Sequence, residues 1–120
     1  MTRVIAERRG HVGWLTLARP EKKNALDQQT AEELLAGLNT FGDDPDIRVI
    51  ALTGRGDDFC AGADLQALEQ MLDAGEAAHL HDAQALGRVF IALRAAQRPV
   101  VAIVRGRALA GGAGLATACD

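Results

Sequence analysis

Two short segments rich in small residues most constrain the fold that this chain can adopt. Residues 58–65 have the sequence DFCAGADL and residues 106–115 have the sequence GRALAGGAGL, and each segment follows a strand-like apolar run. Small residues allow polar atoms of another molecule to approach main-chain N–H groups closely. Two such turns brought together can hold one developing oxyanion between two backbone donors. No special side chain is needed at the donor positions, so small residues suffice.

Apolar runs and helical periodicity alternate along the chain. Apolar runs predict strands at 12–17, 49–53 and 100–104, the last two as buried parallel strands. Helical spacing predicts one helix from about residue 28 and another that ends before Pro99. Their apolar faces comprise Ala31, Leu34, Leu35 and Leu38 in the first helix and Leu86, Val89, Phe90 and Leu93 in the second. Strands that alternate with helices favour an α/β fold with parallel pairing.

Capping and breaking residues mark the ends of these elements. Asp27 is expected to cap the first helix and residues 42–45 to end it. Asp64 is expected to cap a further helix, and Gly111 to begin the last one. The apolar residues of the helix after Asp64 are Leu65, Leu68 and Leu72. Both glycine-containing turns follow the carboxyl ends of predicted strands, which is the usual ligand side of such a sheet.

Composition excludes several classes of function. At 120 residues with 48% hydrophobic residues, the chain is long enough for one domain with a modest core. The formal net charge of −3 gives no electrostatic support for nucleic-acid binding, which usually requires a clustered basic face. No apolar run approaches the roughly 18 residues of a membrane helix, and the N-terminus contains no signal-peptide core. We therefore expect a cytoplasmic protein with no nucleic-acid or membrane partner.

Several side chains that could carry chemistry are better explained by structural roles. Cys60 and Cys119 do not indicate a disulfide framework in a cytoplasmic chain, and Cys60 is expected to be a small core residue. His79 and His81 do not share a helix face, and no third ligand motif follows, so no metal site is expected. Trp14 is expected to lie in the core.

Three motifs, in order and at fitting spacing, resemble the acyl-CoA-binding signatures of the enoyl-CoA hydratase/isomerase (crotonase) family. They are RPEKKNAL at 19–26, FCAGADL at 59–65 and GRALAGGAG at 106–114. One motif alone would be weak evidence, whereas the three together extend the resemblance over nearly the whole chain. The resemblance implies that residues 1–120 form the N-terminal part of an α/β core domain, a crotonase-like spiral of ββα units without the C-terminal trimerisation helices.

The resemblance also implies roles for individual residues. The backbone N–H groups of Ala63 and Gly111 match the two donors that polarise the thioester carbonyl and stabilise its enolate. The residues implied to bind the substrate are Lys22, Lys23, Ala25, Ala61, Ala63, Asp64, Leu65, Gln66 and Gly111. Coenzyme A is then part of an acyl- or enoyl-CoA substrate, so no separate cofactor is expected. The expected assembly is a homotrimer or a dimer of trimers.

The sequence also departs from the family pattern. Gly114 stands where family hydratases carry a glutamate that handles the water, and glycine cannot do acid–base work. A second family carboxylate lies beyond the position matching Asp120, and family members are longer, so we expect a fragment of a larger product. A reaction with a single carboxylate, such as double-bond isomerisation, is then favoured over ordinary hydration. A non-catalytic acyl-CoA-binding module or an inactive fragment is the alternative that these residues leave open.

Overall fold

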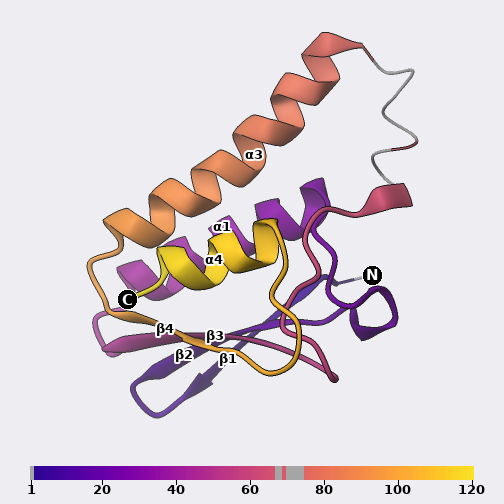
Figure 1. Cartoon of the computed structure of the whole chain (residues 1–120). Coiled ribbons are helices and arrows are strands. Elements are labelled where there is room, and N and C mark those ends of the chain that lie inside the picture. Colours follow the sequence, from indigo (N-terminus) through magenta and orange to yellow (C-terminus); the bar gives the residue numbers. More distant parts are fainter. Residues whose placement is uncertain (1, 67–68, 70–74) are drawn as a thin grey trace.

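The structure, a computed structural model, describes residues 2–66, 69 and 75–120, with the backbone but not the side chains of residues 76–83. A four-stranded sheet with the order β1-β2-β3-β4 forms one layer (Figure 1). Its strands are β1 (Val4–Arg9), β2 (Val12–Leu17), β3 (Val49–Gly54) and β4 (Val100–Ile103). β1 pairs antiparallel with β2, whereas β3 pairs in parallel with both β2 and β4.

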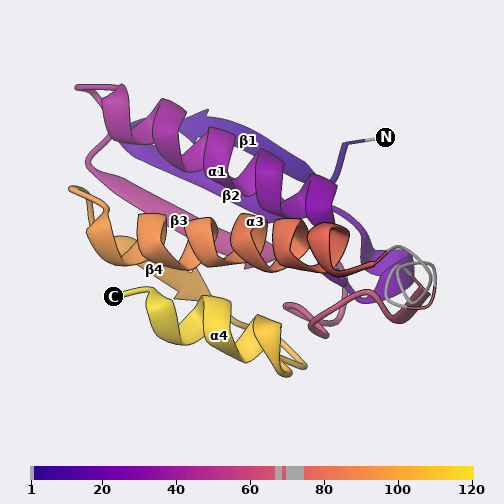
Figure 2. The ribbon, with the colours of Figure 1, turned by 90° about the horizontal axis from the view of Figure 1, so that it is seen from above.

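Helices cover one face of this sheet. The described helices are α1 (Gln28–Asp43), α3 (Glu76–Ala95) and α4 (Gly111–Ala118), with a short 3-10 helix η1 (Pro20–Lys22). Seen from above, α1 lies over β1 and β2, α3 lies over β3, and α4 lies beside α3 toward β4 (Figure 2). None of the helices in the described residues combines the length and the apolarity needed to cross a membrane. The alternation of strands and helices confirms the predicted α/β class with parallel pairing.

α1 follows the predicted pattern. Oδ1 of Asp27 caps the helix by accepting a hydrogen bond from the N–H of Thr30 at 2.8 Å, an interaction worth about 1 kcal/mol. The predicted apolar face is buried, except that Leu35 is only partly buried. The helix ends at Asp43, inside the predicted breaking segment.

The core lies between the sheet and the helices. Because side chains alternate along a strand, every second residue of β2 and β3 points toward the helices. Side chains that are at most 1% exposed include Leu15, Leu17, Leu34, Ile50, Leu52, Val89, Val100 and Leu115. Burying one such side chain contributes roughly 1.5–3 kcal/mol. On α3, Val89 and Leu93 are buried, whereas Leu86 and Phe90 are partly buried.

The sequence pattern does not predict β1. Charged residues, including Glu7, Arg8 and Arg9, replace the apolar run that marks a strand. β1 forms because its six residues pair with β2 across a turn containing Gly10 at φ +60°. Charged side chains are tolerated on an edge strand, where they oppose pairing with other chains.

Trp14 does not lie in the core, so that expectation was wrong. Its neighbours Gly13 and Leu15 are buried toward the helices, which places Trp14 on the opposite face of β2. The guanidinium of Arg9 lies 4.7 Å from the centroid of the partly exposed indole ring. This distance is that of a cation–π contact.

The strand predicted at 100–104 is buried on one face only. β4 lies at an edge of the sheet and ends at Ile103. Val101 and Ile103 are 46% and 42% exposed, whereas Val100 is fully buried. An unbroken apolar run therefore identified the strand but overstated its burial.

The helix predicted after Asp64 is described in part. Leu65, Gln66 and Glu69 are helical, and Leu65 is 74% exposed. Leu68 and Leu72, the other apolar residues predicted for this helix, lie outside the described residues.

Substitutions at two helical glycines, Gly112 in α4 and Gly87 in α3, test the close packing of α4. A Cβ added to Gly112 would overlap the carbonyl oxygen of Cys60, whereas one added to Gly87 of α3 would meet nothing within 4 Å. We expect Gly112→Ala to lower the free energy of unfolding by about 1–3 kcal/mol or more. Gly87→Ala, the matched control, should raise it by up to about 1 kcal/mol because alanine favours a helix. Urea unfolding measures both changes, and equal stabilities would contradict this packing.

Candidate functional site

The loops that follow β2, β3 and β4 pair with one another at the carboxyl end of the sheet. Isolated parallel bridges join Leu26 to Ala63 and Cys60 to Ala108. The N–H of Leu26 donates to the carbonyl of Gly62 at 2.7 Å. The three sequence motifs therefore meet in a second, minimal strand layer. A strand, a bridged segment and a helix follow one another in each case, which fits ββα units.

Asn24 fastens the first of these loops to the second. Its side chain is buried, and its φ of +55° lies in the left-handed region that asparagine tolerates. Its Oδ1 accepts a hydrogen bond from the N–H of Arg19 at 2.8 Å, and its Nδ2 donates to the carbonyls of Arg55 and Asp58, both at 2.9 Å. No pattern in the sequence predicts a structural role for Asn24. Its place at the end of a proline-containing turn, where asparagine favours the left-handed region, is the signal that points to it.

The peptide N–H of Ala63 faces away from the first loop. The residues on either side of Ala63 bond to Leu26: Gly62 accepts at 2.7 Å, and Asp64 donates at 2.8 Å. Ala63 presents its own N–H to the other side, because a residue between two bonded neighbours of a parallel bridge points away from the partner. Ala63 is exposed, and within the described part of the chain its N–H donates to no acceptor.

The N–H of Gly111 opens α4, where helix geometry provides no partner. The N–H of Gly112 donates to Leu109 at 2.8 Å and that of Gly114 donates to Ala110 at 3.0 Å, but the N–H of Gly111 reaches no acceptor among the described residues. Ala110 has φ +48° and ψ −115°, close to the first central residue of a type II′ turn, where glycine is usual. Holding alanine there costs of order 1–3 kcal/mol.

Gly62 brings the two turns into contact. Its φ is +93°, and a Cβ at this position would lie 2.8 Å from the carbonyl oxygen of Leu109 and 3.5 Å from the nitrogen of Gly111. Glycine alone permits both this backbone conformation and this approach. Because Ala63 follows Gly62 directly, the amides of Ala63 and Gly111, which have no acceptor in the described part of the chain, are neighbours.

Apolar side chains surround the contact on the α4 side. A Cβ at Gly111 would lie 3.2 Å from Cδ1 of Leu26 and 3.9 Å from Cδ2 of Leu86. A Cβ at Gly114 would lie 3.1 Å from Cζ of Phe90. An aromatic ring therefore faces position 114, and glycine supplies no ionisable group there.

The other residues implied to bind substrate lie on the first two loops. Ala25 and Asp64 are buried, Ala61 is partly buried, and Lys22, Lys23, Leu65 and Gln66 are exposed. Nζ of Lys22 donates to Oε1 of Gln66 at 3.4 Å, so side chains from the two loops reach each other. The capping role expected for Asp64 is consistent with its Oδ1, which accepts from the N–H of Gln66 at 2.9 Å.

A chain of alternating charges also links the first two loops. Nη1 of Arg19 donates to Oδ2 of Asp64 at 2.6 Å and to Oδ2 of Asp27 at 3.3 Å. Nε of Arg3 donates to the same Asp27 oxygen at 3.2 Å. No sequence pattern predicts this network, because its members are separated along the chain and no spacing rule connects them.

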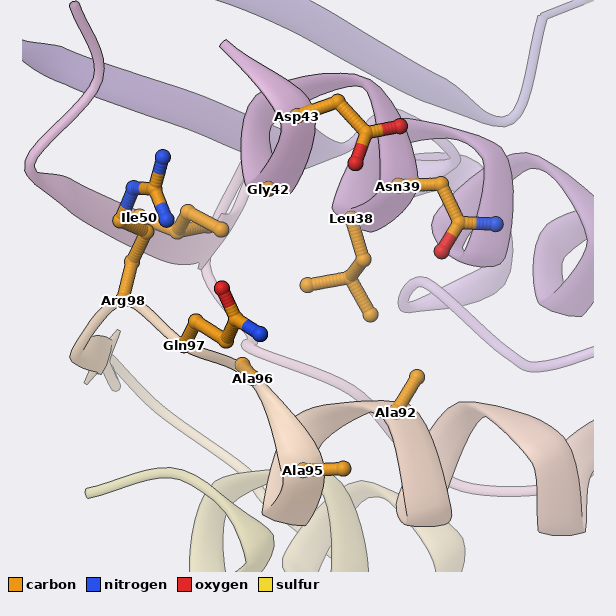
Figure 3. A pocket seen from close by; sticks show the side chains of 10 residues that line it. All are labelled: Leu38, Asn39, Gly42, Asp43, Ile50, Ala92, Ala95, Ala96, Gln97 and Arg98. Atoms are coloured by element: carbon orange, nitrogen blue, oxygen red, sulfur yellow. The ribbon is translucent and has the colours of Figure 1, made fainter. Parts of the chain in front are cut away.

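A pocket of about 250 Å³ lies at the amino ends of the strands, away from the paired amides. Figure 3 shows it between the last turns of α1 and α3, lined by Leu38, Asn39, Gly42, Asp43, Ile50, Ala92, Ala95, Ala96, Gln97 and Arg98. The Arg98 guanidinium is already bound, since Nε donates to Ile47 at 2.8 Å and Nη2 donates to Asp44 at 3.2 Å. No predicted site residue lines this pocket, so the candidate site is placed at the paired amides.

Metal coordination finds no support in the described part of the chain. No group of three or more histidine, cysteine, aspartate or glutamate side chains is arranged there to hold an ion. The side chains of His79 and His81 lie outside the described ones.

Both cysteines are free thiols that pack against main-chain carbonyls. Cys60 is fully buried, as expected, and its Sγ donates to the carbonyl of Asn24 at 3.1 Å. Burial raises its pKa, and a backbone hydrogen bond from Gly62 opposes the rise. For Cys119, burial and then the charge of Asp120 raise the pKa to about 11.

The hydrogen bonds of Asn24 can be tested separately from its backbone conformation. Asn24→Ala removes all three side-chain bonds and places alanine in the left-handed region, so we expect a loss of about 3 kcal/mol or more in unfolding free energy. Asn24→Gly removes the same bonds without backbone strain and should be less damaging by roughly 1 kcal/mol. Urea unfolding provides the measurement. An alanine variant as stable as the parent would refute the role of Asn24.

The raised pKa of Cys119 predicts a loss of stability in alkali. The folded protein holds the thiol proton more tightly than the unfolded chain, whose thiol titrates near 9.0. The associated stability is fully present below pH 9 and is lost as the pH rises toward 11. Sγ of Cys119 donates to the carbonyl of Leu115 at 3.2 Å. Cys119→Ser keeps a donor for this carbonyl but does not titrate in this window. Urea unfolding from pH 8 to pH 11 should show a shallower decline for this variant, and an unchanged decline would argue against the shift.

Comparison with known proteins identifies the family of this chain. A family model described as enoyl-CoA hydratase/isomerase matches residues 7–120. Crotonyl-CoA hydratase of Syntrophomonas wolfei is 40% identical over 98% of this chain and 44% of its own length. (E)-benzylidenesuccinyl-CoA hydratase of Thauera aromatica is 35% identical over the same shares.

Solved structures agree with this assignment. The crystal structure of an enoyl-CoA hydratase from Polaromonas sp. JS666 has a TM-score of 0.94 and 32% identity, covering 98% of this chain and 46% of that one. The chain spans about half the length of the relatives that it matches. The spiral of ββα units implied by the motifs is thus the fold found. From its three motifs, its fold and these similarities, the chain belongs to the enoyl-CoA hydratase/isomerase (crotonase) family.

Proposed function

We propose that this protein binds an acyl- or enoyl-CoA thioester and stabilises its enolate between the backbone N–H groups of Ala63 and Gly111. The observation that carries the proposal is the pair of neighbouring amides that donate to no acceptor in the described residues. Removing a proton next to a thioester carbonyl moves negative charge onto the carbonyl oxygen. Two fixed donors aimed at this oxygen stabilise the charge, and one donor is worth roughly 3–4 kcal/mol.

The first two loops provide the proposed binding surface for the rest of the substrate. Lys22 and Lys23 are exposed and carry point charges that suit the phosphates of coenzyme A. Residues 61–66 would lie along the thioester, with Ala25 supporting them from the first loop. Coenzyme A enters as part of the substrate, so the proposal requires no separate cofactor and no metal.

The environment of Gly114 favours double-bond isomerisation over hydration. The ring of Phe90 faces this position, and glycine offers no group that could activate water. In an isomerisation, one base outside the described residues removes a proton from the carbon next to the carbonyl. The resulting enolate regains a proton two carbons further along, which moves the double bond. Two relatives carry the names of CoA-thioester hydratases, which supports the substrate class.

We further propose a homotrimer or a dimer of trimers in the cytoplasm, without nucleic-acid or membrane partners. The Gly114 position also supports a second candidate function, that of an acyl-CoA-binding module without turnover. Acyl-CoA binding by the intact protein with no conversion of any enoyl-CoA isomer would favour this second candidate.

Gly111→Pro tests the proposed donor directly. Proline removes the N–H, and the first position of a helix tolerates it. We expect kcat on an enoyl-CoA substrate to fall about 10²–10³-fold. Gly111→Ala is the matched control, because it adds a side chain at the same position but keeps the N–H. Its Cβ would lie 3.2 Å from Cδ1 of Leu26. Circular dichroism should show that both variants fold. A proline variant with kcat like that of the alanine variant would sink the donor assignment.

A further inference from the structure

One guanidinium holds the two residues that directly follow the Leu26–Ala63 bridge. Asp27 follows Leu26, and Asp64 follows Ala63. Nη1 of Arg19 lies 2.6 Å from Oδ2 of Asp64 and 3.3 Å from Oδ2 of Asp27. The ion pairs therefore close the same contact that orients the Ala63 amide.

The geometry of Arg19 is itself fixed at both ends. Its main-chain N–H donates to Oδ1 of the buried Asn24 at 2.8 Å. The side chains of Arg19, Asp64 and Asp27 are only 12%, 8% and 16% exposed, so solvent screens the pairs weakly. A guanidinium directs its N–H groups in one plane, whereas a lysine ammonium is a single point charge. The planar group therefore suits a junction between two carboxylates.

We propose that Arg19 is a positioning residue for the Ala63 amide. The inference rests on the function proposed for that amide. Ala63 lies between Gly62, whose φ is +93°, and Asp64, which Arg19 holds. Without the ion pairs, the segment would keep its main-chain hydrogen bonds to the first loop but lose its charged attachment, and the Ala63 N–H could shift from its native direction. A displacement of about 1 Å at a catalytic group can cost on the order of 100-fold in rate.

The test compares Arg19→Gln and Arg19→Lys with Arg3→Gln in the intact protein. Arg3 is the matched control because it binds the same Asp27 oxygen at 3.2 Å, on the side of the network that does not include Asp64. A conjugated 2,4-dienoyl-CoA is the probe, since hydrogen bonds to its carbonyl move its absorbance maximum to longer wavelength. Steady-state kcat and KM on an enoyl-CoA substrate provide the second measurement.

We expect Arg19→Gln to bind the dienoyl-CoA with less than half of the native wavelength shift. Its kcat should fall about 10–100-fold while KM changes less than kcat. Arg19→Lys should lose less of the wavelength shift and less of kcat, because it keeps the charge without the planar group. Arg3→Gln should keep the native wavelength shift even if its melting temperature falls. If Arg19→Gln does not fold, the wavelength shift and kcat of Arg19→Lys test the proposal instead.

The wavelength separates a positioning role from a merely structural one. Partial unfolding lowers the amplitude of the bound spectrum but leaves its maximum in place. A native shift and native kcat per folded molecule in the Arg19 variants would overturn the positioning role and leave the proposed function standing. A native protein that binds the probe without any shift would overturn the donor assignment itself, and the role of Arg19 with it.

Discussion

Hydrogen bonding between the loops after β2, β3 and β4 is the interaction on which the rest of the site depends. Buried main-chain polar groups must find partners, and these loops find them in one another and in the side chain of Asn24. Among the described residues, the N–H groups of Ala63 and Gly111 find no acceptor, and both lie where the loops touch. A site built in this way depends on the residues that set how closely the backbones approach.

Tight backbone geometry is concentrated around these two amides. Gly62 and Ala110 both have positive φ, and Ala110 accepts this conformation without being glycine. Strain of this kind persists only where the surrounding structure enforces it, and it commonly marks functional segments. Here the enforcing contacts are the turn that closes from Gly112 onto Leu109 and the close approach of Gly62. The packing that holds these two amides therefore costs stability locally and is supported by the core beneath α4.

The charged and apolar surroundings of the site are separated. The charges of Arg19, Asp27 and Asp64 lie on the side of the first loop, where they hold the backbone. On the α4 side, Leu86 and Phe90 approach Gly111 and Gly114. An apolar surrounding would strengthen hydrogen bonds to the oxyanion that we propose for this site, because fewer water dipoles screen them.

The sequence by itself determined the α/β class, the strands β2 and β3, the cap and apolar face of α1, and the start of α4 at Gly111. Periodicity and capping are local properties, so they can be read along the chain. The motifs likewise determined which small residues would be brought together. Only the tertiary structure decided the formation of β1, the exposure of Trp14 and β4, the role of Asn24, and the ion pairs of Arg19. Each of these depends on what lies across space from the residue, because pairing, coverage of a sheet face and charge neutralisation involve partners distant in sequence.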